Sequence, residues 1–270
     1  MDAIARFKPE FHYELIVCGL SGHELVGTDV AAVRPEDEAF VRESGDLRWH
    51  RCLRCDSWVP LPPPAEPGRE HAPPRGEIEL PLRGKALRDK IVLRIFAVDK
   101  ALHFVLFAAV AVLILLLESH RAQLRRLEER LDTVFYGTAG KAPAHGPLHE
   151  LHRLLTIQDK AVWAIFAAVT AYAVLEGAEA VGLWFQRRWA EYLTAIATAF
   201  FLPLELYELY DKITVLRVGA LVVNLVILGY LLFAKRLFGL RGGAAADEAA
   251  RAHDSGWDAF HRLTPGASTP

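Results

Sequence analysis

The chain has 270 residues, of which 52% are hydrophobic, and its formal net charge at pH 7 is only −2. So small a net charge excludes the strongly basic composition that draws proteins to nucleic acid. The hydrophobic share is above that of typical soluble proteins. Long apolar runs fall between residues 101 and 238, which indicates an integral membrane protein.

Residues 1–60 predict a small, mainly β domain. Apolar residues alternate with more polar ones from Phe11 onward, which predicts strands within residues 11–33. A proline followed by acidic residues predicts a short helix over 35–42. Prolines dominate residues 61–82, which we expect to form a stiff, extended linker.

Cys52 and Cys55 have the C-x2-C spacing of a zinc-binding turn. Strands expected over 47–51 and 58–61 flank this turn, as strands do in a zinc ribbon. The same spacing also serves thiol redox chemistry, but no thioredoxin-like βαβ pattern surrounds it. Three cysteines in all argue against a disulfide framework. A structural zinc ion would supply folding energy that the thin core of a small domain lacks.

Two more zinc ligands must come from another segment, and Cys18 with His23 is the candidate pair. Together with Cys52 and Cys55 they give a Cys3His site. His50 is an alternative fourth ligand, but His23 is favoured because it completes a separate turn. A closed site with four protein ligands leaves no position for water, so the zinc would be structural and the domain would serve recognition or scaffolding.

Residues 83–238 predict an α-helical membrane domain. Its first part, residues 83–100, is basic and amphipathic, and we expect an interfacial helix lying against anionic headgroups. Four membrane spans are expected over about 101–117, 161–185, 190–210 and 214–234. Residues 239–270 are rich in Ala, Gly, Asp, Ser and Pro and predict a disordered tail.

An even number of spans places both termini on one side of the membrane. Basic residues near the span ends favour the cytoplasm for that side. The N-terminus lacks a basic segment followed by an apolar one, so no cleaved signal peptide is expected. Against this orientation, the segment 118–160 also carries seven Lys and Arg residues.

Several motifs in the membrane domain match a known pattern. They are Leu175–Gly177, Val181–Trp184, Arg188–Glu191, Phe201–Glu208, Val223–Asn224 and Tyr230–Leu231, with a weaker match at Asp99–His103. Over about residues 100–238 the chain resembles a bacterial membrane family catalogued as domain of unknown function 2127. The resemblance implies a multi-pass inner-membrane protein and no particular activity. The cysteine-bearing domain lies outside the pattern and looks like an addition found in actinobacterial members.

Four glutamates lie within the second and third expected spans, where a charge is costly and usually faces the bundle interior or water. One hypothesis is a cation or proton site, and the other is that these groups merely hold the bundle together. The members of the candidate site are Glu176, Glu205, Asn224, Tyr172 and Tyr207. Glu179 and Glu208 fall close enough to the interfaces to be hydrated.

These observations predict a multi-pass membrane protein that acts as a scaffold or regulator. Its zinc domain would bind a protein partner, and its bundle, embedded in the lipid bilayer, would associate with itself or with another membrane protein. The alternative is a small ion or proton transporter or channel that uses Glu176 and Glu205. The sequence contains no H-E-x-x-H motif and no phosphate-binding loop, so no enzyme is expected.

Overall fold

The computed structural model describes residues 12–136, 152–153 and 155–262. The chain forms two compact units. One combines the two ends of the chain, Met1–Val92 and Leu228–Pro270, and is called the terminal unit below. The other, Leu93–Ile227, is called the helical unit.

The terminal unit begins with helix α1, Tyr13–Ser21, where the sequence predicted strands. The prediction was wrong because the apolar run is short, and an apolar run of this length fits a helix as well as a strand. Gly22 ends the helix with a positive φ of 87°, and its N–H donates to the carbonyl of Cys18 at 2.9 Å. Cys18 is the buried residue of this helix.

A three-stranded antiparallel sheet follows, in the order β1-β2-β3. Strands β2 (Leu47–Arg51) and β3 (Trp58–Leu61) confirm the two strands predicted around the cysteine pair. The helix predicted over 35–42 is wrong, because only Pro35–Asp37 forms one 3-10 turn and β1 (Val41–Ser44) starts soon after it.

The core of the terminal unit draws on segments that the sequence analysis treated as unstructured. It consists of Val30, Phe40, Val41, Leu53, Ala72 and Phe260. Ala72 belongs to the expected linker, and the bridge between Val30 and Arg69 aligns that linker with the β domain. The proline-rich segment is therefore packed against the domain, since its apolar side chains find partners there.

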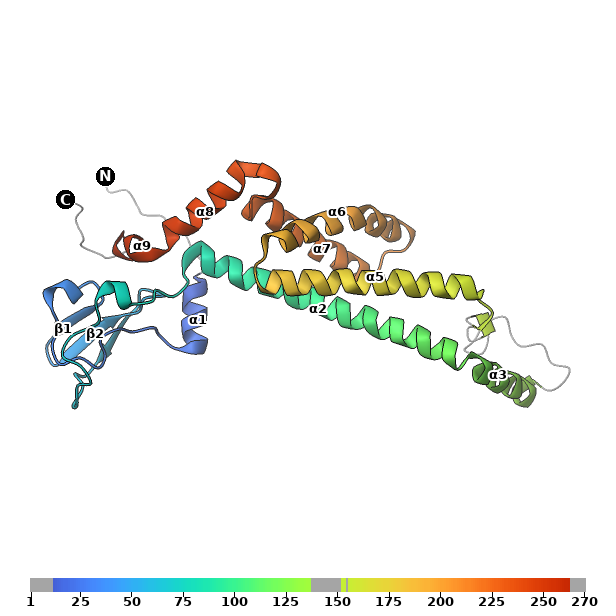
Figure 1. The fold of residues 1–270 in the computed structure, drawn as a ribbon, viewed down its shortest axis with the longest axis horizontal. Coiled ribbons are helices and arrows are strands. Elements are labelled where there is room, and N and C mark those ends of the chain that lie inside the picture. Colours follow the sequence, from blue (N-terminus) through green and yellow to red (C-terminus); the bar gives the residue numbers. More distant parts are fainter. Residues whose placement is uncertain (1–11, 137–151, 154, 263–270) are drawn as a thin grey trace. The chain divides into compact units, whose positions relative to one another are not determined.

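The C-terminal segment is also ordered where a disordered tail was predicted. Residues Gly243–Asp254 form α8 and Gly256–Arg262 form α9, which lies at the sheet in Figure 1. Phe260 is fully buried, and the guanidinium of Arg51 stacks on its ring at 4.0 Å while donating to its carbonyl at 3.1 Å. The alanine-rich sequence of α8 favours a helix. The aromatic residues of α9 supply the contacts that order the C-terminal segment.

Helix α2 runs from Gly84 to Ser119 without a break. The residues predicted to form an interfacial helix over 83–100 are helical and make up the first turns of the helix that contains the first span. Their position against the headgroups stays a prediction. In the terminal unit, the buried carboxylate of Asp89 accepts hydrogen bonds from Tyr230 at 2.6 Å, Lys85 at 3.0 Å and Arg251 at 3.0 Å. These contacts tie α2 to α8 and to the π-helical segment Tyr230–Ala234.

The helical unit contains the membrane-spanning helices. Four helices of the described chain are long and apolar enough to cross a bilayer, which confirms the predicted bundle. They are α2, α5 (Asp159–Trp184), α6 (Arg188–Asp211) and the helix that begins at Val215, whose regular part α7 ends at Gly229. The amphipathic helix α3, Arg121–Tyr136, follows α2.

Glycines allow these helices to approach closely. Figure 1 shows α5 alongside α2, and the ring of Phe104 lies 3.0 Å from where a Cβ on Gly177 would be. A Cβ on Gly182 would meet the Cβ of Ala190 at 2.4 Å, so the hairpin of α5 and α6 requires glycine at this position.

We expect Phe260→Ala to destabilise the terminal unit by about 3–5 kcal/mol, because the substitution leaves a cavity in the core. The expected result is faster hydrogen exchange in β1, β2 and β3, measured on the full-length protein in detergent. Leu20→Ala is the control, since that side chain is 86% exposed and its loss is expected to have little effect. Unchanged exchange in the Phe260 variant would contradict the packing of α9.

We expect Gly182→Ala to lower the stability of the helical unit by about 1–3 kcal/mol, because the added methyl group overlaps Ala190. Thermal unfolding followed by circular dichroism in detergent would measure the loss. Gly219→Ala serves as the matched control, since a Cβ there meets nothing within 4 Å. Equal melting temperatures for the two variants would disprove close packing of α5 on α6.

Candidate functional site

The terminal unit brings four metal-binding side chains together. One ligand atom from each of Cys18, His23, Cys52 and Cys55 lies within 4.8 Å of the other three. The sulfurs of Cys18 and Cys52 are 3.7 Å apart, which is far too long for a disulfide, and the sulfur of Cys55 is 3.4 Å from His23 Nδ1.

Two turns present these ligands. Cys18 lies in the last turns of α1, and His23 follows the glycine that ends this helix. Cys52 and Cys55 lie on the turn between β2 and β3, which Asp56 closes with a positive φ of 61° and an N–H donated to the carbonyl of Cys52 at 3.1 Å. Backbone contacts therefore fix the turn, independently of a bound ion.

The donor set and its spacing fit a tetrahedral zinc ion. Zn–S bonds of about 2.3 Å place two sulfurs on a tetrahedron about 3.8 Å apart, and a sulfur and an imidazole nitrogen about 3.5 Å apart. The measured separations of 3.7 Å for Cys18 and Cys52 and 3.4 Å for Cys55 and His23 are close to both values. Three thiols and one imidazole are also the ligands that zinc prefers in structural sites.

His50, the alternative fourth ligand, lies elsewhere. It is buried in β2, and its Nδ1 is 3.1 Å from the carbonyl oxygen of Val26. Burial lowers the pKa of His50, as expected for an imidazole that acts as a neutral core residue. The structure therefore assembles His23, and not His50, with the cysteines.

The electrostatic setting of the cysteines differs from one thiol to the next. Burial, followed by the neighbouring thiols of Cys55 and Cys52, raises the pKa of Cys18 to about 12. Burial opposes the shift at Cys55, but hydrogen bonds with Ser57 and the other cysteines outweigh it and lower the pKa of that thiol. The guanidinium of Arg54 lies 3.9 Å from the sulfur of Cys18, where it would offset the net negative charge of a zinc ion with three thiolates.

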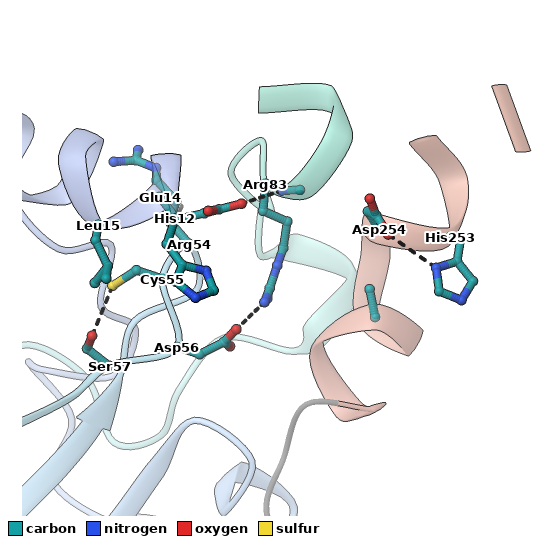
Figure 2. Close-up of a pocket in the computed structure, with 12 residues that line it drawn as sticks. His12, Glu14, Leu15, Arg54, Cys55, Asp56, Ser57, Arg83, His253 and Asp254 are labelled. Carbon is teal, nitrogen blue, oxygen red and sulfur yellow. Dashed lines mark hydrogen bonds and ion pairs between the residues drawn. The ribbon is translucent and has the colours of Figure 1, made fainter. Parts of the chain in front are cut away.

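A cavity of about 600 Å³ adjoins the cysteine turn in the terminal unit (Figure 2). Leu15 of α1, Cys55 of the turn, Arg83 before α2 and Asp254 of α8 all line it. Inside it Arg83 pairs with Asp56. The sequence did not predict this cavity, because its walls come from both ends of the chain.

The helical unit holds a second group of charges, which centres on Lys100. The ammonium of Lys100 in α2 lies 3.1 Å from Glu176 and 3.0 Å from Glu179, both in α5. The side chains of the two glutamates are 2% and 0% exposed. Glu179 was expected to be hydrated at an interface; that expectation was wrong, because the neighbouring helices cover it completely.

Sequence analysis missed three members of this cluster. His103 Nδ1 lies 3.8 Å from Glu176 and 3.7 Å from Asp99. Asp99, Lys100 and His103 precede or begin the first apolar run. Two signals pointed to them: they are polar residues beside a span, and they form the weaker family match at Asp99–His103.

Of the other predicted intramembrane residues, Tyr172 lies beside Glu176, whereas Glu205, Asn224 and Tyr207 have no contact with Lys100 in the described part of the chain. Asn224 of α7 donates a short hydrogen bond to Glu205 of α6, so the structure brings this pair together. Tyr172 packs its ring edge-on between the rings of Phe107 and Phe201. Tyr207 is 70% exposed and does not belong to the pair of Glu205 and Asn224. The side chain of Glu208 is 52% exposed and lies 3.8 Å from Arg217.

Comparison with known proteins agrees with this architecture. The family described as "Predicted membrane protein (DUF2127)" matches residues 92–235. The uncharacterized proteins Mb0093 of Mycobacterium bovis and Rv0090 of Mycobacterium tuberculosis are each 35% identical to this chain over 241 residues, which cover 88% of this chain and 90% of theirs. No solved structure matches the chain.

The likeness to the mycobacterial proteins is longer than the family region and so includes part of the terminal unit. The family region itself contains α5, α6 and α7 and the cluster around Lys100. Four membrane-spanning helices and a match over more than half of its length give one conclusion: the chain belongs to the DUF2127 family of predicted membrane proteins.

Proposed function

We propose that this protein is a membrane scaffold or regulator whose zinc-ribbon-like domain binds a protein partner. A structural zinc ion held by Cys18, His23, Cys52 and Cys55 would stabilise that domain. The observation that carries the proposal is the approach of all four ligand atoms to within 4.8 Å of one another. Cys18 and Cys52 are 34 residues apart along the chain, and His23 and Cys55 are 32 apart. One ion would therefore cross-link α1 and the loop after it to the sheet.

A site of this kind has no catalytic position. Three thiolates and one imidazole complete the usual coordination of structural zinc, so no water is left to be activated for hydrolysis. The metal would instead supply folding energy to a domain whose described apolar core is a small cluster around Val30, Phe40 and Phe260. Binding of a partner protein is therefore the role that best suits a small domain stabilised by a metal ion.

The cavity beside the cysteine turn is the proposed recognition surface. It presents an apolar wall at Leu15 together with charges of both signs, such as Arg83 and Asp254. An apolar side chain flanked by charged ones on a partner protein would match this lining. The cavity is formed by loops and helix ends, which are the usual places for binding residues.

We also propose that both ends of the chain face the cytoplasm of a bacterial inner membrane. Phe260 packs in the same core as Phe40, which supports a placement of both termini on one side of the bilayer. Four spans agree with this placement. Free thiols at the cysteine cluster fit a reducing compartment, which favours the cytoplasm.

Purified full-length protein is expected to contain about one zinc ion per chain, as measured by elemental analysis in detergent. The full chain is needed because Phe260 belongs to the core of the domain that binds the metal. The double substitution Cys52→Ser with Cys55→Ser removes two of the four ligands and is expected to abolish the zinc content.

His23→Ser should lower zinc retention in the presence of a chelator. His71→Gln is the matched control, since that histidine lies 3.4 Å from the carbonyl of Ala32 and outside the cluster. A wild-type protein that is folded and free of zinc would refute the metal centre. Equal loss of zinc in the His23 and His71 variants would exclude His23 as the ligand.

We expect Leu15→Glu to abolish co-purification of a protein partner with the detergent-solubilised chain, because the substitution places a charge on the apolar wall of the cavity. Leu20→Glu is the control on the same helix, since Leu20 does not line the cavity. Partner capture would be measured by quantitative mass spectrometry of the two purified variants and the wild type. Identical partner sets in all three would disprove recognition through this cavity.

A further inference from the structure

The cluster around Lys100 has more acidic than basic groups. Lys100 contributes one positive charge, and the two carboxylates that it contacts, Glu176 and Glu179, would contribute two negative charges if both were ionised. Their side chains are between 0% and 7% exposed, so water does not compensate the difference. An uncompensated charge at this position is costly, and a buried carboxylate avoids that cost by binding a proton.

Some buried carboxylate oxygens of the cluster also lack a hydrogen-bond partner. Lys100 donates to Oε1 of Glu176, whereas Oε2 of Glu176 and Oε1 of Glu179 are buried without a hydrogen-bond partner at good geometry. The hydroxyl groups of Tyr172 and Thr194 also lie beside these carboxylates, but they are neutral and do not offset the second negative charge. A proton shared by the two carboxyl groups would offset that charge and give a buried oxygen the partner that such oxygens nearly always have.

Among the described residues, the charged and titratable groups that the structure places near the pair come from three helices. They are Asp99, Lys100 and His103 of α2, Tyr172, Glu176 and Glu179 of α5, and Arg188 and Glu191 of α6. Glu205 of α6 also acts on Tyr172. Glu191 is close to Arg188, with 3.8 Å between their charged atoms, so these two charges offset each other. Asp99 adds a further carboxylate, which is 32% exposed and lies 3.7 Å from His103. The excess negative charge in the buried part of the cluster therefore lies with Glu176 and Glu179.

A route for the proton leads through His103. Its Nδ1 lies 3.8 Å from Glu176 and 3.7 Å from Asp99, distances that one water molecule or a small rotation would bridge. The side chains of His103 and Asp99 are 46% and 32% exposed. They therefore connect the buried pair to the surface of the helical unit, and imidazole is the side chain best suited to pass a proton near neutral pH.

We propose that Glu176 and Glu179 form a proton-binding site that holds one exchangeable proton beside Lys100 at neutral pH. The proton reaches the pair from Asp99 through Nδ1 of His103 and leaves by the same path. A transport function of this bundle would run through this site and not through the separate pair of Glu205 and Asn224. The site is independent of the zinc domain, so failure of one proposal leaves the other intact.

Infrared spectroscopy of the full-length protein in a detergent without ester or acid groups tests this site, because a protonated carboxyl group has a C=O band that ionised carboxylates lack. Wild-type protein at neutral pH is expected to show the band. Glu179→Gln should remove one carboxyl equivalent of it, since Lys100 then neutralises Glu176 alone. Lys100→Met should add one equivalent, because both carboxyls must then be neutral.

Glu208→Gln, at a half-exposed carboxylate outside the cluster, should leave the band unchanged, as should the zinc-site variant Cys52→Ser with Cys55→Ser. No band in the wild type, or an unchanged band in both Glu179→Gln and Lys100→Met, would overturn the proposal. If Glu179→Gln fails to fold, the gain expected in Lys100→Met still decides the question.

Discussion

A charge that leaves water needs an opposite charge, and this requirement governs both units of the protein. In the terminal unit, Asp89 is fully buried, and its charge is stabilised there because Lys85 and Arg251 donate hydrogen bonds to it. In the helical unit, Lys100 can lie between membrane helices because two glutamates face it. Removing one partner from such a group leaves a buried charge, which typically costs about 3–5 kcal/mol. These pairings therefore fix where α2 meets its neighbours more firmly than apolar contacts, which lipid can replace.

Local signals in the sequence predicted part of this architecture. The strands beside the cysteines and the four spans were found because hydrophobic period and length are properties of one segment. Helices α8 and α9 were missed because their order depends on distant contacts, such as that of Phe260 with Arg51. Helix α1 was predicted as strands because a short apolar run fits either element. The partners of Lys100 lie 76 residues away, so no local pattern could reveal them.

The candidate metal centre was predictable for a different reason. Ligand chemistry restricts zinc to few residue types, and the chain has only three cysteines from which to choose. The choice between His23 and His50 needed the structure, which places His50 in β2 against Val26. The cavity beside the centre could not be foreseen, because α8 contributes to its wall from the far end of the chain.

The burial of Phe260 beside Phe40 has a consequence for biosynthesis. A ribosome makes the β domain first, but one of its core residues is added more than 200 residues later, after all four spans. The domain must therefore wait, incompletely packed, while the helices enter the bilayer. A chain truncated before α9 would lack Phe260 and leave this core open, which would expose the N-terminal domain to proteases.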